Sequence, residues 1–261
     1  MSKLIPAIIV KNLALYYGNL KALQGVSLNI YQQQVTALIG SSGCGKSALI
    51  KSLNRIGELE ANIKVDGKVE FFGQDIYSYS VNLNRLRHQI GMVFPKPNLF
   101  PMSIYDNVAY GIRVARHCPK SELDGIVESA IKDAVLWDEV KNKLDKPALS
   151  LSAGQQQRLC IARALAVKPR VLLMDEPCSA LEPVATMKIE ELIESLRGKL
   201  TIVIVSDNVE QAQRIADFIA FFSTDQNRVG QMVEFGTTEQ IFKNPLNQRT
   251  RDYVSGHLSL R

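Results

Sequence analysis

One short run constrains this chain more than any other feature of its sequence: Gly40-Ser41-Ser42-Gly43-Cys44-Gly45-Lys46-Ser47. It fills every fixed position of the pattern G-x-x-x-x-G-K-[ST], in which glycines let backbone N–H groups surround a polyphosphate. In this pattern Lys46 reaches the β and γ phosphates, and the Ser47 hydroxyl joins the shell of a magnesium ion. The run, with Ala48 directly after it, predicts a site for a nucleoside triphosphate.

The segments on either side of the loop support this interpretation. Val35–Ile39 is apolar enough for a buried strand, and Ala48–Ile56 has helical character. A strand, a tight loop and a helix place a phosphate at the helix N-terminus, where backbone N–H groups are free. A glycine-rich turn with a chance lysine would need neither flank, so we discard that interpretation.

Composition places the chain among globular proteins. Its 261 residues, 46% of them hydrophobic, are enough for one α/β domain with a substantial core. No apolar run approaches the ~18 residues of a membrane-spanning helix, and the first residues lack the apolar region of a signal peptide. We therefore expect a cytosolic chain that is free to dock on a membrane protein.

Charge and cysteine content exclude several classes of site. The net charge of +5 comes from 31 basic and 26 acidic residues, spread without a block of like charge, so a nucleic-acid surface is not expected. The cysteines show no C-x-x-C spacing, which argues against a zinc site and a disulfide framework. We expect reduced thiols at Cys44, Cys118, Cys160 and Cys178.

The order of apolar patterns divides the chain into β-rich and helical parts. From Ser103 to Ala166 the apolar spacing is helical, with a helix start expected at Ser121, as in an insertion. Another helical stretch, Met187–Leu196, separates two buried strands, and strand–helix–strand implies a parallel sheet. Helical turns close the chain up to Ser255. Strands are expected at 7–15, 26–30, 35–39, 68–72, 90–94, 171–174, 201–205, 218–222 and 229–235.

Two carboxylates follow the buried strand Val171–Met174. Asp175 is suited to hold Mg²⁺ through water, and Glu176 is suited to polarise an attacking water. Ordinary solvated acids at a strand end are the alternative, but beside a phosphate loop we favour the functional interpretation. We take Glu176 as the candidate general base and Lys46 as the second candidate catalytic residue.

A third motif opens a helix with the run Leu151-Ser152-Ala153-Gly154-Gln155-Gln156-Gln157-Arg158. Ser152 is a good N-cap, and a helix N-terminus accepts a phosphate. Alone, the run indicates only a capped helix rich in glutamine. Together with the phosphate loop and the Asp175-Glu176 strand end, in this order, it resembles the ATP-binding cassette of ABC transporters.

The resemblance covers Val10 to about Ser255 and implies a dimer that binds ATP and Mg²⁺. In this family the signature stretch of one subunit closes over the ATP of another, so the signature residues would act in trans: Ser152, Ala153, Gly154 and Gln155. Tyr17 stands where the family places an aromatic residue that stacks on adenine. A strand-end tyrosine without that role is the alternative, because aromatics are common in strands.

The implied fold is α/β: a P-loop nucleotide-binding core with a mostly parallel sheet, an N-terminal antiparallel β subdomain and an inserted α-helical subdomain. We expect one ATP-binding domain over 1–261. Within it, 1–94 and 160–261 would form the core and β subdomain, and 95–159 the helical signature subdomain.

A second resemblance points to phosphate-import members of the family. Residues 96–111 resemble their coupling region, and Leu53-Asn54-Arg55 fits the same group. This implies transmembrane permease subunits and a phosphate-binding protein as partners, and a peripheral position on the cytoplasmic face of the inner membrane. Nothing in the chemistry of these residues itself recognises phosphate.

Three replacements concern parts of the cassette that support catalysis. Ala153 replaces the first glycine of the signature, which adds one methyl group, and Glu182 replaces the usual aspartate of the run Ser179–Pro183. Pro95 replaces a glutamine that approaches Mg²⁺ and the attacking water and hinges the helical lobe. Proline has no such side chain and fixes its own φ, so both the contact and the motion are affected.

Asp207 is the most serious departure, because the family places there a histidine that donates a hydrogen bond to the γ phosphate. An ionised carboxylate ~4 Å from a phosphate charge meets repulsion of about 4 kcal/mol at an effective dielectric of 20. It avoids this only by swinging away or by taking up a proton. Alternatively, Asp207 is a harmless N-cap of the helix Asn208–Ala216.

These features predict an ATP-binding, slowly hydrolysing subunit that powers phosphate import. The alternative is a catalytically weakened regulatory cassette that pairs with an intact paralogue. A DNA-repair or ribosome-associated ATPase is a third class, but the chain has no long coiled-coil insertion, no second cassette and no clustered basic stretch.

Overall fold

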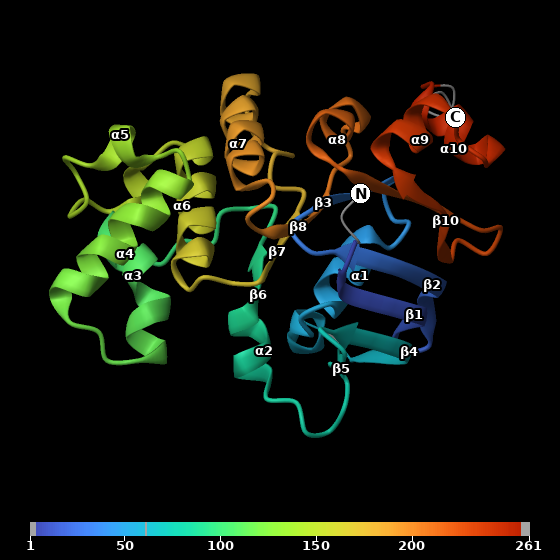
Figure 1. The fold of residues 1–261 in the computed structure, drawn as a ribbon, viewed down its shortest axis with the longest axis horizontal. Helices are drawn as coiled ribbons and strands as arrows, with labels where there is room; N and C mark the ends of the chain where they lie inside the picture. Colours follow the sequence, from blue (N-terminus) through green and yellow to red (C-terminus); the bar gives the residue numbers. More distant parts are fainter. Residues whose placement is uncertain (1–3, 61, 257–261) are drawn as a thin grey trace.

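The computed structural model describes residues 4–60 and 62–256, which build one ten-stranded sheet with helices packed against it (Figure 1). The strands are β1 (Pro6–Tyr17), β2 (Leu20–Tyr31), β3 (Val35–Gly40), β4 (Ile63–Phe71), β5 (Gln74–Asp75), β6 (Ile90–Val93), β7 (Val171–Asp175), β8 (Thr201–Val205), β9 (Phe218–Thr224) and β10 (Gly230–Thr237). The helices are α1 (Lys46–Ser52), η1 (Ile56–Leu59), α2 (Leu83–Gln89), α3 (Ile104–Ala115), α4 (Lys120–Asp133), α5 (Trp137–Val140), η2 (Ala148–Ser150), α6 (Ala153–Ala166), α7 (Pro183–Leu196), α8 (Val209–Ile215), α9 (Thr238–Lys243) and α10 (Gln248–Val254).

The sheet has a parallel half and an antiparallel half. Its strand order is β5-β4-β1-β2-β10-β9-β3-β8-β7-β6. Strands β9, β3, β8, β7 and β6 pair in parallel, whereas β1 pairs antiparallel with both β2 and β4. This confirms the predicted α/β class with a parallel core and an antiparallel N-terminal part.

Two apolar cores lie on opposite faces of the parallel strands. In β8, Ile202 and Ile204 join one core, and Val203 and Val205 join the other. Strands β3 and β7 alternate in the same way, so each strand is buried on both faces. This is why the sequence there is continuously apolar and not alternating. The first core continues into the helices α3 to α8, and the second holds α1 against the curled antiparallel strands.

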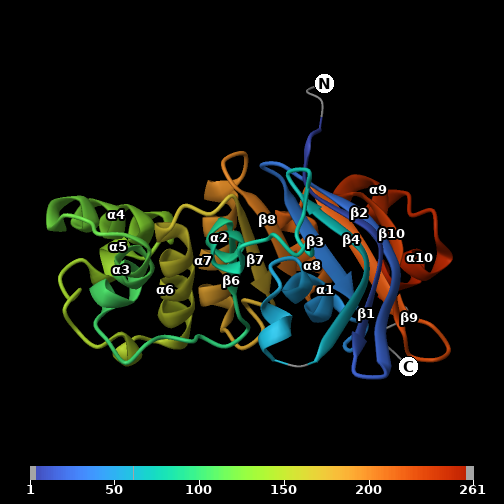
Figure 2. The ribbon, with the colours of Figure 1, turned by 90° about the horizontal axis from the view of Figure 1, so that it is seen from below.

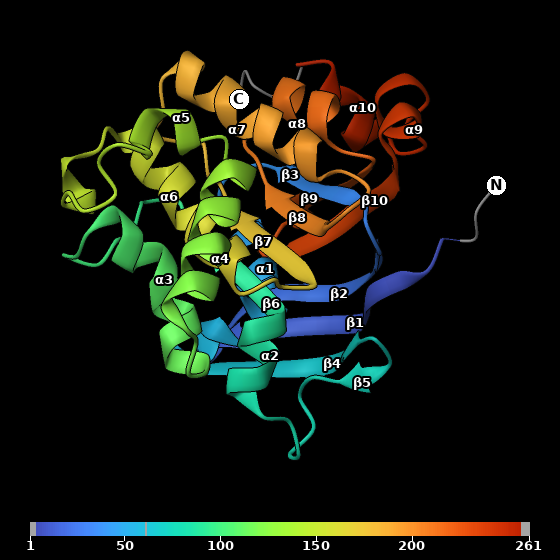
Figure 3. The same ribbon diagram turned by 60° about the vertical axis from the view of Figure 1, so that its left-hand side comes forward.

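Helices α3 to α6 gather at one end of the molecule, away from the antiparallel strands, and α9 and α10 lie near the other end (Figures 2 and 3). The cluster of helices agrees with the predicted helical insertion. The proposed boundary between residues 159 and 160 falls within α6, and the division into 1–94, 95–159 and 160–261 stays a prediction. No helix in the described part of the chain is long and apolar enough to cross a bilayer.

Several helix boundaries differ from the predicted ones. Helix α4 begins at Lys120 with Pro119 as its N-cap, so the start predicted at Ser121 is wrong. The Pro119 carbonyl already accepts the Leu123 N–H at 3.0 Å, so the first turn forms without a side-chain cap. Helix α7 starts at Pro183, where a fixed φ suits the first turn. The four cysteines are free, as predicted.

Candidate nucleotide site

The phosphate loop joins the end of β3 to the start of α1 through backbone conformations that require glycine. Gly40, Gly43 and Gly45 have φ angles of 143°, 78° and 93°. A Cβ atom on Gly40 would lie 2.0 Å from the Phe222 carbonyl oxygen, and one on Gly45 would lie 2.4 Å from Leu23 Cδ2. The loop is therefore wedged between neighbouring strands, and residues with a Cβ atom cannot replace Gly40 or Gly45 without displacing those neighbours.

Lys46 lies at the centre of the loop and is 4% exposed. Its Nζ donates to the Gly40 carbonyl at 2.6 Å and to the Ser41 carbonyl at 3.1 Å. It also forms an ion pair with Asp207 Oδ1 at 3.0 Å. The structure therefore joins the predicted phosphate-binding lysine to the residue that replaces the family's histidine.

Ser47 and Asp175 meet across the interface between α1 and β7. The Ser47 hydroxyl donates to Asp175 Oδ1 at 2.8 Å, and Asp175 is 2% exposed. Burial raises the pKa of Asp175, and the hydrogen bond from Ser47 opposes that shift. The arrangement places two oxygen atoms of the kind that Mg²⁺ prefers side by side. Their role as ligands stays a prediction.

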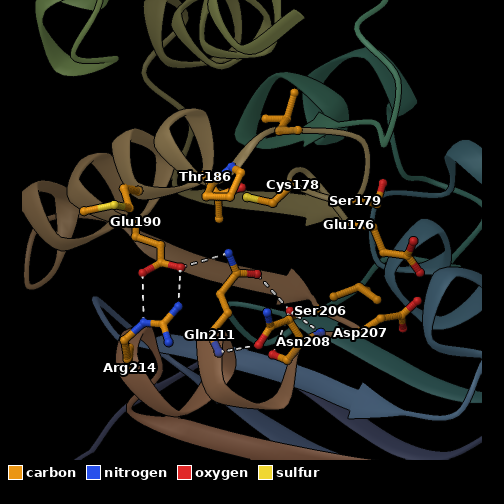
Figure 4. Close-up of a pocket in the computed structure, with 14 residues that line it drawn as sticks. Glu176, Cys178, Ser179, Thr186, Glu190, Ser206, Asp207, Asn208, Gln211 and Arg214 are labelled. Carbon is orange, nitrogen blue, oxygen red and sulfur yellow. Dashed lines mark hydrogen bonds and ion pairs between the residues drawn. The ribbon is translucent and has the colours of Figure 1, made fainter.

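Glu176 begins the loop after β7 in a left-handed conformation, with φ of 45°. Its N–H donates to the Val205 carbonyl at 3.1 Å, which ties the end of β7 to the end of β8. Burial, then the charges of Asp207 and Asp175, raise the pKa of Glu176. Figure 4 shows the Glu176 and Asp207 carboxylates together at one side of a cavity of about 740 Å³.

A second cavity, of about 530 Å³, opens beside the phosphate loop. Tyr17 lines it, as the adenine-stacking role requires, and partial burial raises the pKa of its hydroxyl. The predicted residues that share this cavity are Ser42, Gly43, Gly45, Lys46, Ser47, Ala48 and Glu176. Sequence reasoning missed five others: Leu20, Lys21, Ala22, Asn227 and Arg228.

Asn227 and Arg228 belong to the turn between β9 and β10. Asp225 closes this turn by accepting the N–H groups of Asn227 and Val229, both at 2.8 Å. Only the pairing of β10 with both β9 and β2 brings the turn to the cavity. Its local sequence signals a tight turn but not its position in the fold.

The signature stretch forms a regular helix start in the helical part of the molecule. Ser152 is the N-cap of α6 in a reciprocal capping box with Gln155, so the predicted cap is confirmed. Ala153 is exposed, and a Cβ on Gly154 would lie 2.5 Å from Ala185 Cβ. Among the described residues that line the two cavities, none comes from 152–155. The structure therefore does not bring the signature to this chain's own phosphate loop.

Glu139 of α5 is the centre of a polar cluster that holds the signature helix α6. Glu139 accepts hydrogen bonds from Gln155 at 2.7 Å and from Arg158 at 2.9 Å and 3.1 Å, and Lys188 of α7 contacts it at 2.5 Å. Partial burial opposes ionisation, but these donors prevail and lower the pKa of Glu139 to about 2. Three helices are thus joined at one carboxylate.

Two of the residues that depart from the family pattern, Pro95 and Glu182, lie at element ends, one after β6 and one before α7. Pro95 is the second residue after β6, and the buried Gln157 of α6 donates to the carbonyl of the intervening Phe94 at 2.8 Å. That bond ties the helical part to the strand end, but a proline ring supplies no polar group there. Glu182 is exposed and is the N-cap residue of α7.

Asp207 does not cap α8, so that alternative is wrong. The cap is Asn208, whose Oδ1 accepts the Gln211 N–H at 2.8 Å. The reason is electrostatic: Lys46 offers a nearly buried cation, and the Asp207 carboxylate turns towards it.

Comparison with known proteins places these features in context. Residues 23–179 match the sequence pattern of the ABC transporter family. The chain is 67% identical over 254 residues to phosphate import ATP-binding protein PstB 5 of Trichormus variabilis, covering 97% of this chain and 98% of the relative. It has the same identity and coverage with phosphate import ATP-binding protein PstB 2 of a Nostoc species.

Solved structures carry the same fold. CbiO1 from Clostridium perfringens, described as part of the ABC transporter complex CbiONQ, superimposes with a TM-score of 0.77 at 28% identity. The match covers 97% of this chain and 98% of that one. The likeness therefore includes both the sheet and the helical part.

Proposed function

This chain belongs to the ABC transporter family, and we propose that it is the ATP-binding, slowly hydrolysing subunit that powers import of inorganic phosphate. The observation that carries the proposal is 67% identity to phosphate import ATP-binding proteins over nearly the whole chain. The site agrees with it, since a glycine-dependent loop, a buried lysine and a strand-end carboxylate meet at one edge of the sheet. Such a set binds a triphosphate.

We expect Mg²⁺ to accompany ATP. Mg²⁺ prefers oxygen ligands and commonly takes one or two from protein beside phosphate and water. The adjacent oxygens of Ser47 and Asp175 fit this need and would hold the ion. Across residues 4–60 and 62–256 there is no cluster of three His, Cys, Asp or Glu side chains that could bind a metal without phosphate. When bound, the ion neutralises charge on the phosphates.

Hydrolysis requires a base that takes a proton from the attacking water. Glu176 lies directly after Asp175, lines both cavities and has a raised pKa, which makes its ionised form a stronger base. Phosphoryl transfer otherwise depends on positioning and on donors to the γ phosphate. Asp207 supplies a charge of the wrong sign and Pro95 supplies no donor, so turnover is slow.

The partners we propose are permease subunits, a phosphate-binding protein and a second cassette. The coupling region has a defined shape, because the buried Asn107 donates to the Phe100 and Ser103 carbonyls and accepts the Phe100 N–H, all within 3.1 Å. Met102 and Tyr110 nearby are about 40% exposed and offer apolar contact area. The chain would lie on the cytoplasmic face of the inner membrane. Ser152–Gln155 would act on a partner's ATP.

A second candidate is a weakened cassette that pairs with an intact paralogue. The Lys46–Asp207 ion pair favours it, because it occupies the phosphate-binding lysine. The intact capping box of α6 would still serve a partner's site. The test mixes this chain with an intact cassette and measures complex formation and the rate of ATP hydrolysis. If the two chains form no complex and the rate does not change, the pairing is contradicted.

The test of import uses the chain with permease subunits in membrane vesicles and radiolabelled phosphate. We expect ATP-dependent uptake that unlabelled phosphate inhibits and sulfate does not. Lys46→Ala should abolish uptake, while the exposed control Lys243→Ala should retain it. Failure to co-purify with any permease, or uptake of another anion in preference to phosphate, would contradict the proposal.

A further inference from the structure

The ammonium group of Lys46 has its three N–H donors matched within the chain. Two face the Gly40 and Ser41 carbonyls of the phosphate loop, and the third faces Asp207 Oδ1. An ammonium group has three donors and no acceptor. A phosphate that binds Lys46 must therefore displace one of these partners, and the backbone carbonyls belong to the wedged loop.

Asp207 is the partner that can be displaced. Its side chain is 53% exposed, whereas Lys46 is 4% exposed. It follows β8 and lies beside Glu176, which follows β7, so two carboxylates stand at the same strand ends. The terminal phosphate of a triphosphate would meet both of them, whereas the α and β phosphates are held by the loop N–H groups.

The backbone around Asp207 is held on both sides. The Ser206 N–H donates to the Leu38 carbonyl at 3.2 Å, and its buried hydroxyl accepts the Asn208 N–H at 3.1 Å. Ser206 Oγ also lies 2.9 Å from Gln211 Oε1, and Asn208 accepts the Gln211 N–H. Asp207 therefore lies at the centre of a compact turn.

A chain of hydrogen bonds fixes this turn to α7 (Figure 4). Gln211, which is 3% exposed, donates to Glu190 Oε1 at 3.2 Å. Arg214 donates to both Glu190 oxygens, at 3.0 Å and 2.8 Å. Because the turn is tied at several points, the backbone of Asp207 stays beside Lys46 even when its carboxylate is displaced.

We propose that Asp207 is a specificity-determining residue that makes this site favour a nucleoside diphosphate over the triphosphate. A diphosphate reaches Lys46 with its β phosphate alone and brings no γ phosphate to the strand ends. A triphosphate, besides displacing Asp207 from Lys46, places its γ phosphate beside the Asp207 and Glu176 carboxylates. The inference rests on the proposed ATP-binding function and adds that product ADP competes strongly with ATP.

The test measures binding of ADP and of the slowly hydrolysed analogue AMP-PNP, each with Mg²⁺, to the purified full chain by calorimetry. We expect the wild type to bind ADP roughly tenfold more tightly, equivalent to about 1.4 kcal/mol. Asp207→Asn should bring the two affinities within about twofold by strengthening AMP-PNP binding. The control Asp133→Asn removes an exposed carboxylate at the end of α4 and should keep the wild-type ratio.

Asp207→Ala makes the same test if Asp207→Asn does not fold. If the ratio of ADP affinity to AMP-PNP affinity is the same in the wild type, Asp207→Asn and Asp207→Ala, the inference is overturned. Failure of the wild type to bind either nucleotide would overturn the proposed function and the inference together. Nucleotide selection without phosphate uptake in vesicles would contradict phosphate import only, and would leave the inference supported.

Discussion

The phosphate loop and the strand ends at Pro95 and Asp207 depend on the chain in different ways. The loop is held by backbone conformations, since a Cβ on Gly40 would come within 2.0 Å of the Phe222 carbonyl. The strand ends act through single side chains that project from an otherwise regular sheet. A side chain at Gly40 or Gly45 would disturb the fold, whereas a replacement at Pro95 or Asp207 changes a residue that lies outside the paired strands.

Nucleotide binding and hydrolysis can therefore separate within one fold. Strands β6 and β8 keep their parallel pairing with β7 although each is followed by an atypical residue. Nucleotide binding therefore depends on parts that the fold itself requires. The γ-phosphate contacts that we propose depend on side chains outside the paired strands.

The largest expected effect comes from Glu176→Gln, which tests whether the hydrolytic part of the site works at all. Loss of the general base should lower the rate of ATP hydrolysis by about 10²–10⁴-fold while ADP binding stays within a few fold. The base acts when ionised, so the wild-type rate should rise with pH through the raised pKa of Glu176. Single-turnover hydrolysis measured over a range of pH gives both the rate loss in Glu176→Gln and the pH dependence of the wild type. Equal rates in the wild type and Glu176→Gln would show that Glu176 is not the general base.

Lys46→Ala should have the next largest effect and tests the phosphate loop. The change removes a buried cation and leaves Asp207 without its ion-pair partner. A bound β phosphate then loses its cationic partner, and truncation of one member of such a charge pair costs ~2–5 kcal/mol of binding free energy, so affinity for ADP should fall about 100-fold or more. Calorimetry measures this, with exposed Lys243→Ala as the control. A loss of less than threefold would show that the loop does not bind through this lysine.

Asp207→His should raise hydrolysis and tests the strand end of β8. A single positioned donor to a developing charge is worth about 10²–10³ in rate where it is optimally placed. We expect a gain of roughly tenfold, because the surrounding turn is shaped around aspartate. Steady-state release of phosphate at saturating ATP checks this. The exposed Asp133→Asn should leave the rate unchanged, and an equal rate for Asp207→His would contradict an impaired strand end.

Pro95→Gln should give the smallest gain, about two- to threefold, since the strand end of β6 is also tied by Gln157 to the Phe94 carbonyl. The same hydrolysis assay measures it. If Pro95→Gln raises the rate of hydrolysis more than Asp207→His does, then Pro95 limits the rate more than Asp207, contrary to our expectation.

The parts that could be predicted from sequence are those with a local signal. The runs that form β3, β7 and β8 are continuously apolar because both faces are buried, and the phosphate loop and Asp175 follow directly from them. Ser152 was recognisable as a cap from its own neighbourhood. These elements needed no knowledge of distant contacts.

The parts that were missed depend on tertiary contacts. The sequence around Asp207 suggests a phosphate neighbour or a helix cap, yet the partner of Asp207 is Lys46, which lies on another element. Arg228 reaches the second cavity only because β10 joins both halves of the sheet. Neither contact leaves a trace in the adjacent sequence.

The double variant Pro95→Gln/Asp207→His restores both strand ends at once, and its rate of ATP hydrolysis at saturating ATP and Mg²⁺ is compared with that of the wild type. We expect a rate at least about tenfold higher, with ADP affinity within a few fold of the wild type. A double variant that hydrolyses ATP no faster than the wild type would contradict the claim that an intact phosphate loop is limited by its strand ends.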